Sequence, residues 1–70
     1  MDPQAAWNEM LDAIAANDLF EAELRAEELI RWLDRGGFAP QTLLRLLPDE
    51  WDQLICRYLC RKVMLAIKSQ

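Results

Sequence analysis

Histidine is absent from this chain of 70 residues. Its absence removes the histidine general base, the Ser-His and Cys-His nucleophile pairs, and every imidazole metal ligand. A pair of carboxylates remains available in principle for acid–base chemistry. The acidic residues, however, fall on the exposed faces of predicted helices, where water surrounds them. We therefore expect a protein that is not an enzyme and that holds no cofactor.

Glycine and cysteine are each limited to two residues. The adjacent pair Gly36-Gly37 follows a predicted helix, whereas a phosphate-binding loop follows a strand and opens a helix. Cys56 and Cys60 are too few for the disulfide framework of a secreted protein, and they run parallel along one helix instead of converging into a bridge. We interpret them as small buried hydrophobic residues and expect no metal within one chain; a dimer that combines four thiolates is the alternative.

Long apolar runs are also missing. The longest run near the C-terminal end covers residues 63–67, whereas roughly 20 residues are needed to span a bilayer. The N-terminal stretch is acidic and polar, unlike a secretory signal. We expect a cytoplasmic protein with no membrane contact.

Apolar residues are nevertheless abundant, at 53% of the chain, beside 29% charged residues. So short a chain forms one domain, residues 1–70, and buries only about 60% of the surface that the unfolded chain exposes. Association with another chain would bury the apolar surface that stays exposed after folding. The net charge of −4 argues against nucleic acid as a partner. Residues 1–35 carry nine acids and three arginines, and residues 36–70 carry three acids and five bases. The two halves are electrostatically complementary.

The first half predicts an antiparallel helical hairpin. Asp2-Pro3 is typical of a helix start, and the first helix is expected over residues 3–16. Asn17-Asp18 forms the turn, with Asp18 capping a second helix over 19–35. One face of each helix is apolar, and the residues expected to be buried there are Trp7, Met10, Leu11, Ile14, Leu19, Ala22, Ala26, Leu29, Ile30 and Leu33.

The stretch from Trp32 to Pro40 predicts a firm helix stop. We expect Gly37 to adopt the left-handed conformation that closes the helix and Phe38 to pack back on Leu33. Proline then prevents the helix from continuing. After Pro40 the pattern predicts a short helical turn that carries Leu43, Leu44, Leu46 and Leu47.

The last helix is expected over residues 48–68 and is apolar over more than half of its circumference. One hairpin cannot cover so much apolar surface, so the pattern favours a homo-oligomer or another protein partner, with Trp51, Tyr58 and Leu59 as anchors. On the second helix Phe20, Leu24 and Trp32 lie off the buried face. Either the third helix covers Phe20 and Leu24 while arginine stems cover Trp32, or these residues contact a partner.

A basic strip on the last helix supports a second hypothesis. Arg57, Arg61 and Lys68 share one side of this helix, and Arg45 and Lys62 lie elsewhere in the same half. Such a strip can follow a phosphate backbone, which would make the chain a small nucleic-acid-associated or regulatory protein. No aromatic residue is interleaved with the strip, so we favour a solvated face or one that meets the acidic second helix of a neighbouring copy.

Two resemblances accompany these patterns. The hairpin resembles a tetratricopeptide unit at its aromatic, leucine and small-residue positions, which implies a helix–turn–helix geometry; these positions are Trp7, Leu11, Ile14, Ala22, Ala26 and Leu29. The stretch Trp32–Pro40 is similar to a recurring phrase in short, uncharacterised bacterial helical proteins of the planctomycete kind, which implies no known activity. We conclude that the sequence predicts an all-α bundle that acts as a self-associating, non-enzymatic interaction module.

Overall fold

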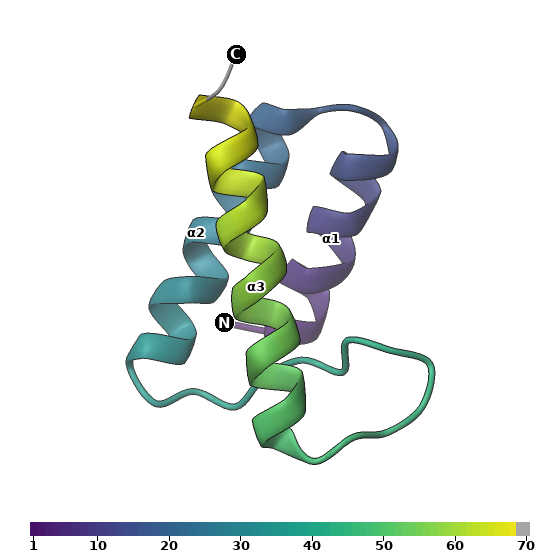
Figure 1. The fold of residues 1–70 in the computed structure, drawn as a ribbon, viewed down its shortest axis with the longest axis vertical. Helices are drawn as coiled ribbons and strands as arrows, with labels where there is room; N and C mark the ends of the chain where they lie inside the picture. The colour runs from purple at the N-terminus through teal and green to yellow at the C-terminus, as the bar shows by residue number, and fades with distance from the viewer. Residues whose placement is uncertain (69–70) are drawn as a thin grey trace.

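The computed structural model describes the backbone of residues 1–68 and the side chains of residues 1–66. It contains three helices, α1 (Pro3–Ala15), α2 (Leu19–Asp34) and α3 (Asp49–Lys68), and no strand occurs in this part of the chain (Figure 1). The predicted all-α architecture is confirmed, and each helix bound agrees with its prediction to within one residue. The middle helix α2 packs against both α1 and α3. None of the three helices is long and apolar enough to cross a membrane.

The hairpin forms through the predicted caps. Asp2 accepts hydrogen bonds at Oδ1 from the backbone N–H groups of Gln4, at 3.0 Å, and Ala5, at 3.3 Å. The turn places Asn17 in the left-handed region with φ 57°, and Asp18 Oδ1 accepts from the Glu21 N–H at 3.2 Å. These bonds satisfy N–H groups that the first turn of each helix leaves without a partner.

The core lies where the three helices meet. Alanines on α1 and α2 allow close approach of the two helices, and larger side chains fill the remaining space; the buried apolar residues are Ala6, Trp7, Met10, Ala13, Ala22, Ala26, Leu29, Leu33, Cys56, Cys60 and Val63. The expected burial of Leu11 is wrong, because the loop residues beside it, Leu43 and Leu44, are themselves exposed and do not cover it.

The helix stop begins one residue earlier than predicted. Gly36, with φ +88°, is the left-handed residue, so the expectation for Gly37 is wrong. The Gly36 N–H donates to Leu33 O at 3.0 Å and the Gly37 N–H to Trp32 O at 2.9 Å, the bond pair of a Schellman motif. Phe38 contacts Trp32 edge to face, at 5.7 Å between ring centroids.

Gly37 serves a different purpose from the one expected of it. A Cβ atom at this position would overlap the indole of Trp32, whose ring lies directly on the Gly37 backbone. The indole Nε1 donates to Phe38 O at 2.7 Å. The second glycine therefore makes room for the tryptophan and does not supply a left-handed conformation.

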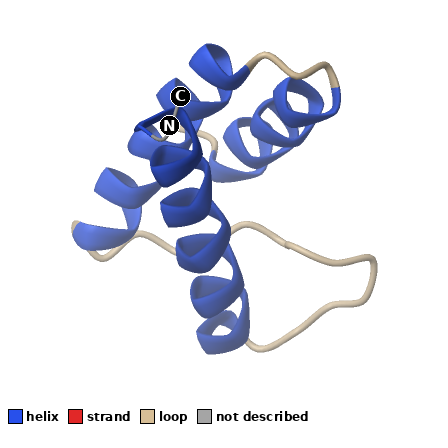
Figure 2. Cartoon of the chain, turned by 45° about the horizontal axis from the view of Figure 1, so that its top comes forward, coloured by secondary structure: helices blue, strands red, loops and turns tan. Residues whose placement is uncertain are grey.

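The short helix expected after Pro40 does not form. The segment between α2 and α3 is a long loop that extends away from the bundle (Figure 2). Gln41 exchanges two hydrogen bonds with the side chain of Gln4: its N–H donates to Oε1 at 2.8 Å and its carbonyl accepts from Nε2 at 3.1 Å. The Thr42 N–H donates to Asp52 Oδ1 at 3.0 Å. These long-range bonds take the backbone groups that a helix would need, so the leucines that follow are carried on an open loop.

Candidate functional site

Helix α3 has two apolar faces, and the hairpin covers only one of them. The inward face holds Asp52, Cys56, Cys60 and Val63, all buried. The opposite face holds Trp51, Leu54, Tyr58 and Leu65, which are 55% to 66% exposed. The predicted surplus of apolar surface on the last helix is therefore present, and it is gathered on one side.

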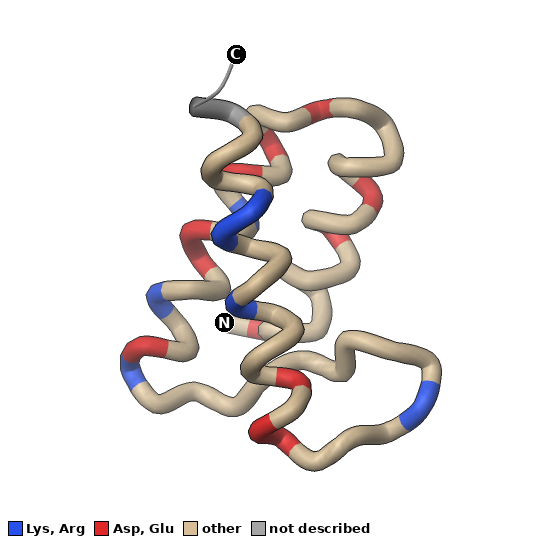
Figure 3. Tube along the Cα trace, in the orientation of Figure 1, with Lys and Arg blue, Asp and Glu red and all other residues tan. Residues whose placement is uncertain are grey.

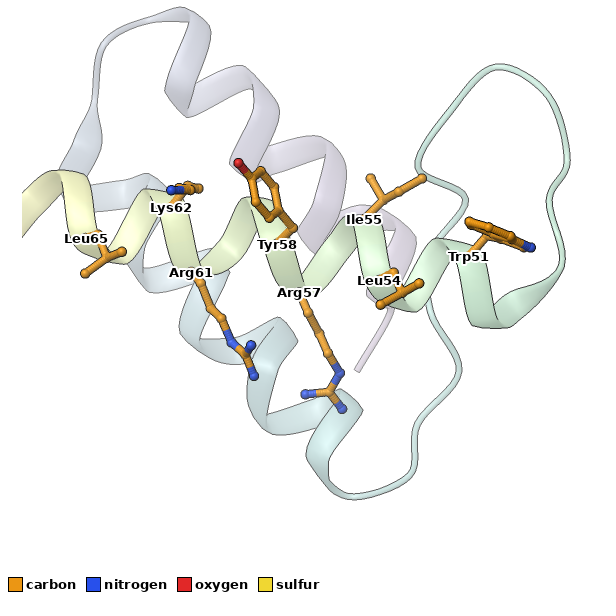
Figure 4. Close-up of a pocket in the computed structure, with 8 residues that line it drawn as sticks. All are labelled: Trp51, Leu54, Ile55, Arg57, Tyr58, Arg61, Lys62 and Leu65. Atoms are coloured by element: carbon orange, nitrogen blue, oxygen red, sulfur yellow. The ribbon is translucent and has the colours of Figure 1, made fainter.

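The exposed side forms a shallow apolar hollow along α3, which we call the α3 outer face (Figure 4). Aromatic and aliphatic side chains make its floor, and three basic residues lie along its edges; its lining residues are Trp51, Leu54, Ile55, Arg57, Tyr58, Arg61, Lys62 and Leu65. All of them come from one helix. The face is therefore held rigid by the packing of the other side of α3 on the hairpin.

The basic residues of this face are partly engaged within the chain. Arg57 and Arg61 both extend toward α2 (Figure 4), and Arg57 Nη1 pairs with Asp34 Oδ1 at 2.7 Å. On the other edge the Lys62 ammonium lies 5.4 Å from the centroid of the Tyr58 ring, a cation–π contact. The side chain of Lys68, the third member of the predicted basic strip, lies outside the described residues. The described strip is thus short, and one of its two arginines is neutralised.

Charge is distributed unevenly over the bundle (Figure 3). The acidic residues gather on α1, on α2 and at the start of α3, while the middle of α3 carries bases. On the hairpin, Arg25 ties the two helices together through Glu9 at 3.0 Å and also pairs with Glu21 and Glu28. The hydrogen bond that Arg25 donates to Glu21, together with the charges of Glu21 and Glu28, raises the pKa of Arg25. The hairpin therefore presents a negative surface around one internal arginine.

The other predicted interface residues fall in different environments. Phe20 is 71% exposed and Leu24 is 41% exposed, so the interpretation that the third helix covers them is wrong. The buried residues of α2, which lie between Ala22 and Leu33, make its contacts with both other helices. Phe20 and Leu24 lie outside this buried row. Leu59, predicted as an anchor with Trp51 and Tyr58, is half-buried and packs against the core.

Trp32 is turned onto its own chain. Its ring is half-buried between Gly37 and Phe38, and the Arg35 guanidinium carbon lies 5.9 Å from the ring centroid. This arrangement corresponds to the interpretation in which an arginine stem covers the indole. The indole N–H is already paired with Phe38 O, so the polar edge of this residue is occupied.

The two cysteines are fully buried and reduced. Their sulfurs lie 4.0 Å apart, and Cys60 Sγ lies 3.9 Å from Met10 Sδ in α1. The hydrogen bond with Cys56, together with burial, raises the pKa of the Cys60 thiol. No group of three or more cysteine, aspartate and glutamate side chains that could hold a metal occurs in residues 1–66. Because the sulfurs face the interior of one bundle, their burial argues against the alternative of four thiolates shared by two copies.

The start of α3 contains a feature that sequence reasoning missed. Asp52 is buried, and its Oδ1 accepts both the N–H and the hydroxyl of Thr42, at 3.0 and 2.6 Å. Asp49 accepts the Ala39 N–H at 2.9 Å, and this bond, with a second from Gln53, lowers the pKa of Asp49. Acids in a first helical turn predict capping, but which loop they bind is decided by the fold. Together the hydrogen bonds of Asp49 and Asp52 fix the N-terminal end of α3 and thereby the position of Trp51.

No protein-family model matches this chain, and neither a curated protein nor a solved structure matches it. The tetratricopeptide-like and planctomycete-like resemblances therefore stay predictions.

Proposed function

We propose that this chain is a non-enzymatic protein–protein interaction module whose docking surface is the α3 outer face. The observation that carries the proposal is the row of four large apolar side chains, Trp51, Leu54, Tyr58 and Leu65, each more than half exposed on one side of one helix. Single exposed apolar residues are ordinary on protein surfaces. A contiguous apolar patch with a polar edge is typical of an interaction site.

The composition of the face suits protein binding. Tryptophan, tyrosine and arginine are the residue types that most often dominate binding energy at protein interfaces. Each large aliphatic side chain that passes from water into a fully buried contact contributes about 1.5 to 3 kcal/mol. The helix that carries them is already fixed by Cys56, Cys60 and Val63 in the core, so little backbone ordering opposes binding.

Self-association is the first form of docking that we propose. A chain of 70 residues has a marginal core of its own, and a second copy would cover apolar surface that the hairpin leaves open. The two free thiols fit a reducing compartment, so the proposed location is the cytoplasm.

Binding to nucleic acid is the second candidate function, supported by the exposed bases Arg61 and Lys62. The pairing of Arg57 with Asp34 and the net charge of −4 weaken it. A basic site predicts binding to DNA or RNA at low salt that falls steeply as salt is added. Absence of binding at low salt would remove this candidate.

The first proposal is tested by two matched substitutions. Leu54→Asp places a charge on the α3 outer face, and Leu44→Asp places the same charge on the fully exposed loop. Both positions are open to solvent, so both variants should keep their helical circular dichroism. We expect Leu54→Asp to weaken association at least tenfold, because binding would bury an unpaired carboxylate, and Leu44→Asp to leave it unchanged. Equal association of the two variants would contradict the proposal.

A further inference from the structure

We propose that the α3 outer face binds the α3 outer face of a second copy, with the two helices antiparallel and crossing at Tyr58. This inference rests on the proposed function and names its partner. It is carried by the spacing of the exposed residues along α3 and by the distribution of charge along the same helix.

The exposed residues follow the spacing of a coiled-coil seam. Trp51, Leu54, Tyr58, Arg61 and Leu65 succeed one another at alternating steps of three and four residues. This alternation keeps a narrow stripe on one side of a helix and is the pattern by which two helices pack side by side at a small crossing angle. The buried residues of α3 lie on the opposite side, so a second helix could lie along the seam without disturbing the core.

The seam has a midpoint, which a two-fold pairing requires. Trp51 and Leu65 each lie seven residues from Tyr58, on either side of it. An antiparallel pair centred on Tyr58 therefore brings Trp51 of each copy next to Leu65 of the other, and the two tyrosines together in the middle. One surface then serves both copies, as in the isologous interface of a symmetric dimer.

Charge along α3 selects the antiparallel direction. Asp49 and Glu50 are exposed at its N-terminal end, and Arg61 and Lys62 are exposed beyond its middle. A parallel pair would place Arg61 beside Arg61 and acid beside acid, and would also align the two helix dipoles. An antiparallel pair centred on Tyr58 places Glu50 opposite Ala66 of the other copy, four residues from Lys62, and moves Arg61 six residues away from Arg61. The charges therefore favour the reversed copy over the parallel one.

Other occupants predict different assemblies. A second copy that used its acidic hairpin, around Phe20 and Leu24, would make a head-to-tail contact between unlike surfaces. Such contacts extend into rings or open chains instead of stopping at two copies. An unrelated protein on the α3 outer face would leave the free chain monomeric.

Spin labels at two exposed positions test the direction. Glu50→Cys and Ala66→Cys lie eight residues before and after Tyr58, and the buried native cysteines are expected to stay unlabelled, which wild-type protein checks. At a rise of 1.5 Å per residue, an antiparallel pair separates two identical labels by roughly 24 Å along the axis. Mixing the two labelled variants should add a population about 10 Å apart, near the interaxial distance.

Each outcome has a distinct meaning. Long distances in each variant alone, with a short distance only in the mixture, support the antiparallel pair. Short distances in each variant alone, with a long one in the mixture, would overturn the antiparallel direction and leave the proposed function standing. Assemblies that grow beyond two copies on light scattering would overturn the paired α3 helices. A monomer at every concentration would overturn this inference. The α3 outer face would then be proposed to bind a different protein.

Discussion

Asp52 and Thr42 are joined by two hydrogen bonds, because Asp52 Oδ1 accepts both the backbone N–H and the hydroxyl of Thr42. Asp52 is the one buried charged residue among those whose side chains the structure describes. Its bonds fasten the loop to the first turn of α3. The position of the α3 outer face therefore depends on a contact that lies on the opposite side of the same helix.

Asp52→Ala is expected to lower the free energy of unfolding by about 2 kcal/mol, because hydrogen bonds to a charged group are lost and the Thr42 N–H is left without a partner. Glu50→Ala is the matched control, since Glu50 is an exposed acid in the same turn and should change stability by less than about 0.5 kcal/mol. Urea denaturation measures both. Equal effects would mean that the Asp52 contact does not stabilise the fold.

The two glycines of the helix stop are expected to respond differently to alanine. Gly36→Ala places a Cβ in the left-handed region and should cost about 1 kcal/mol of stability. Gly37→Ala should instead displace the Trp32 indole, which lies on the Gly37 backbone. The measurement is the NMR signal of the Trp32 indole N–H, which should lose the shift of its hydrogen bond to Phe38 in Gly37→Ala and keep it in Gly36→Ala. An unmoved signal in Gly37→Ala would contradict the close approach.

The two cysteines are expected to react with thiol reagents only when the bundle opens. Both are fully buried, which keeps reagents away from the sulfurs. The hydrogen bond between them raises the pKa of Cys60 and lowers that of Cys56, so burial and not the thiolate fraction protects the pair. Ala66→Cys supplies an exposed thiol on the same helix as a control. The control should react within seconds to minutes and the native pair at the rate of opening. Fast reaction of the native pair would mean that the sulfur cluster is accessible.

Local sequence predicted the hairpin and α3 well, because their signals are local. Asp2, Asn17 and Asp18 cap or close helices through bonds to neighbours within a few residues. The segment after Pro40 was predicted wrongly because its conformation depends on Gln4, which is 37 residues away from its partner Gln41. No helical propensity in the leucines could reveal that bond.

The candidate site was predicted in outline only. The apolar circumference of the last helix predicted surplus surface, but Leu59 was chosen as an anchor and packs against the core. Leu54 and Leu65, which complete the α3 outer face, were not chosen. The signal was available in the spacing, since Trp51, Leu54, Tyr58 and Leu65 follow one stripe and Asp52, Cys56, Cys60 and Val63 follow another. Which stripe meets the hairpin depends on how the three helices pack, which local pattern does not specify.

In the proposed pairing the α3 outer face brings two copies together. Light scattering across a dilution series measures the solution mass of the purified chain and tests this pairing. We expect a dimer, about twice the 8.2 kDa of one chain, that dissociates on dilution, and we expect Leu54→Asp to be a monomer at every concentration. A wild-type chain that stays folded and monomeric at the highest concentration would contradict self-association through this face.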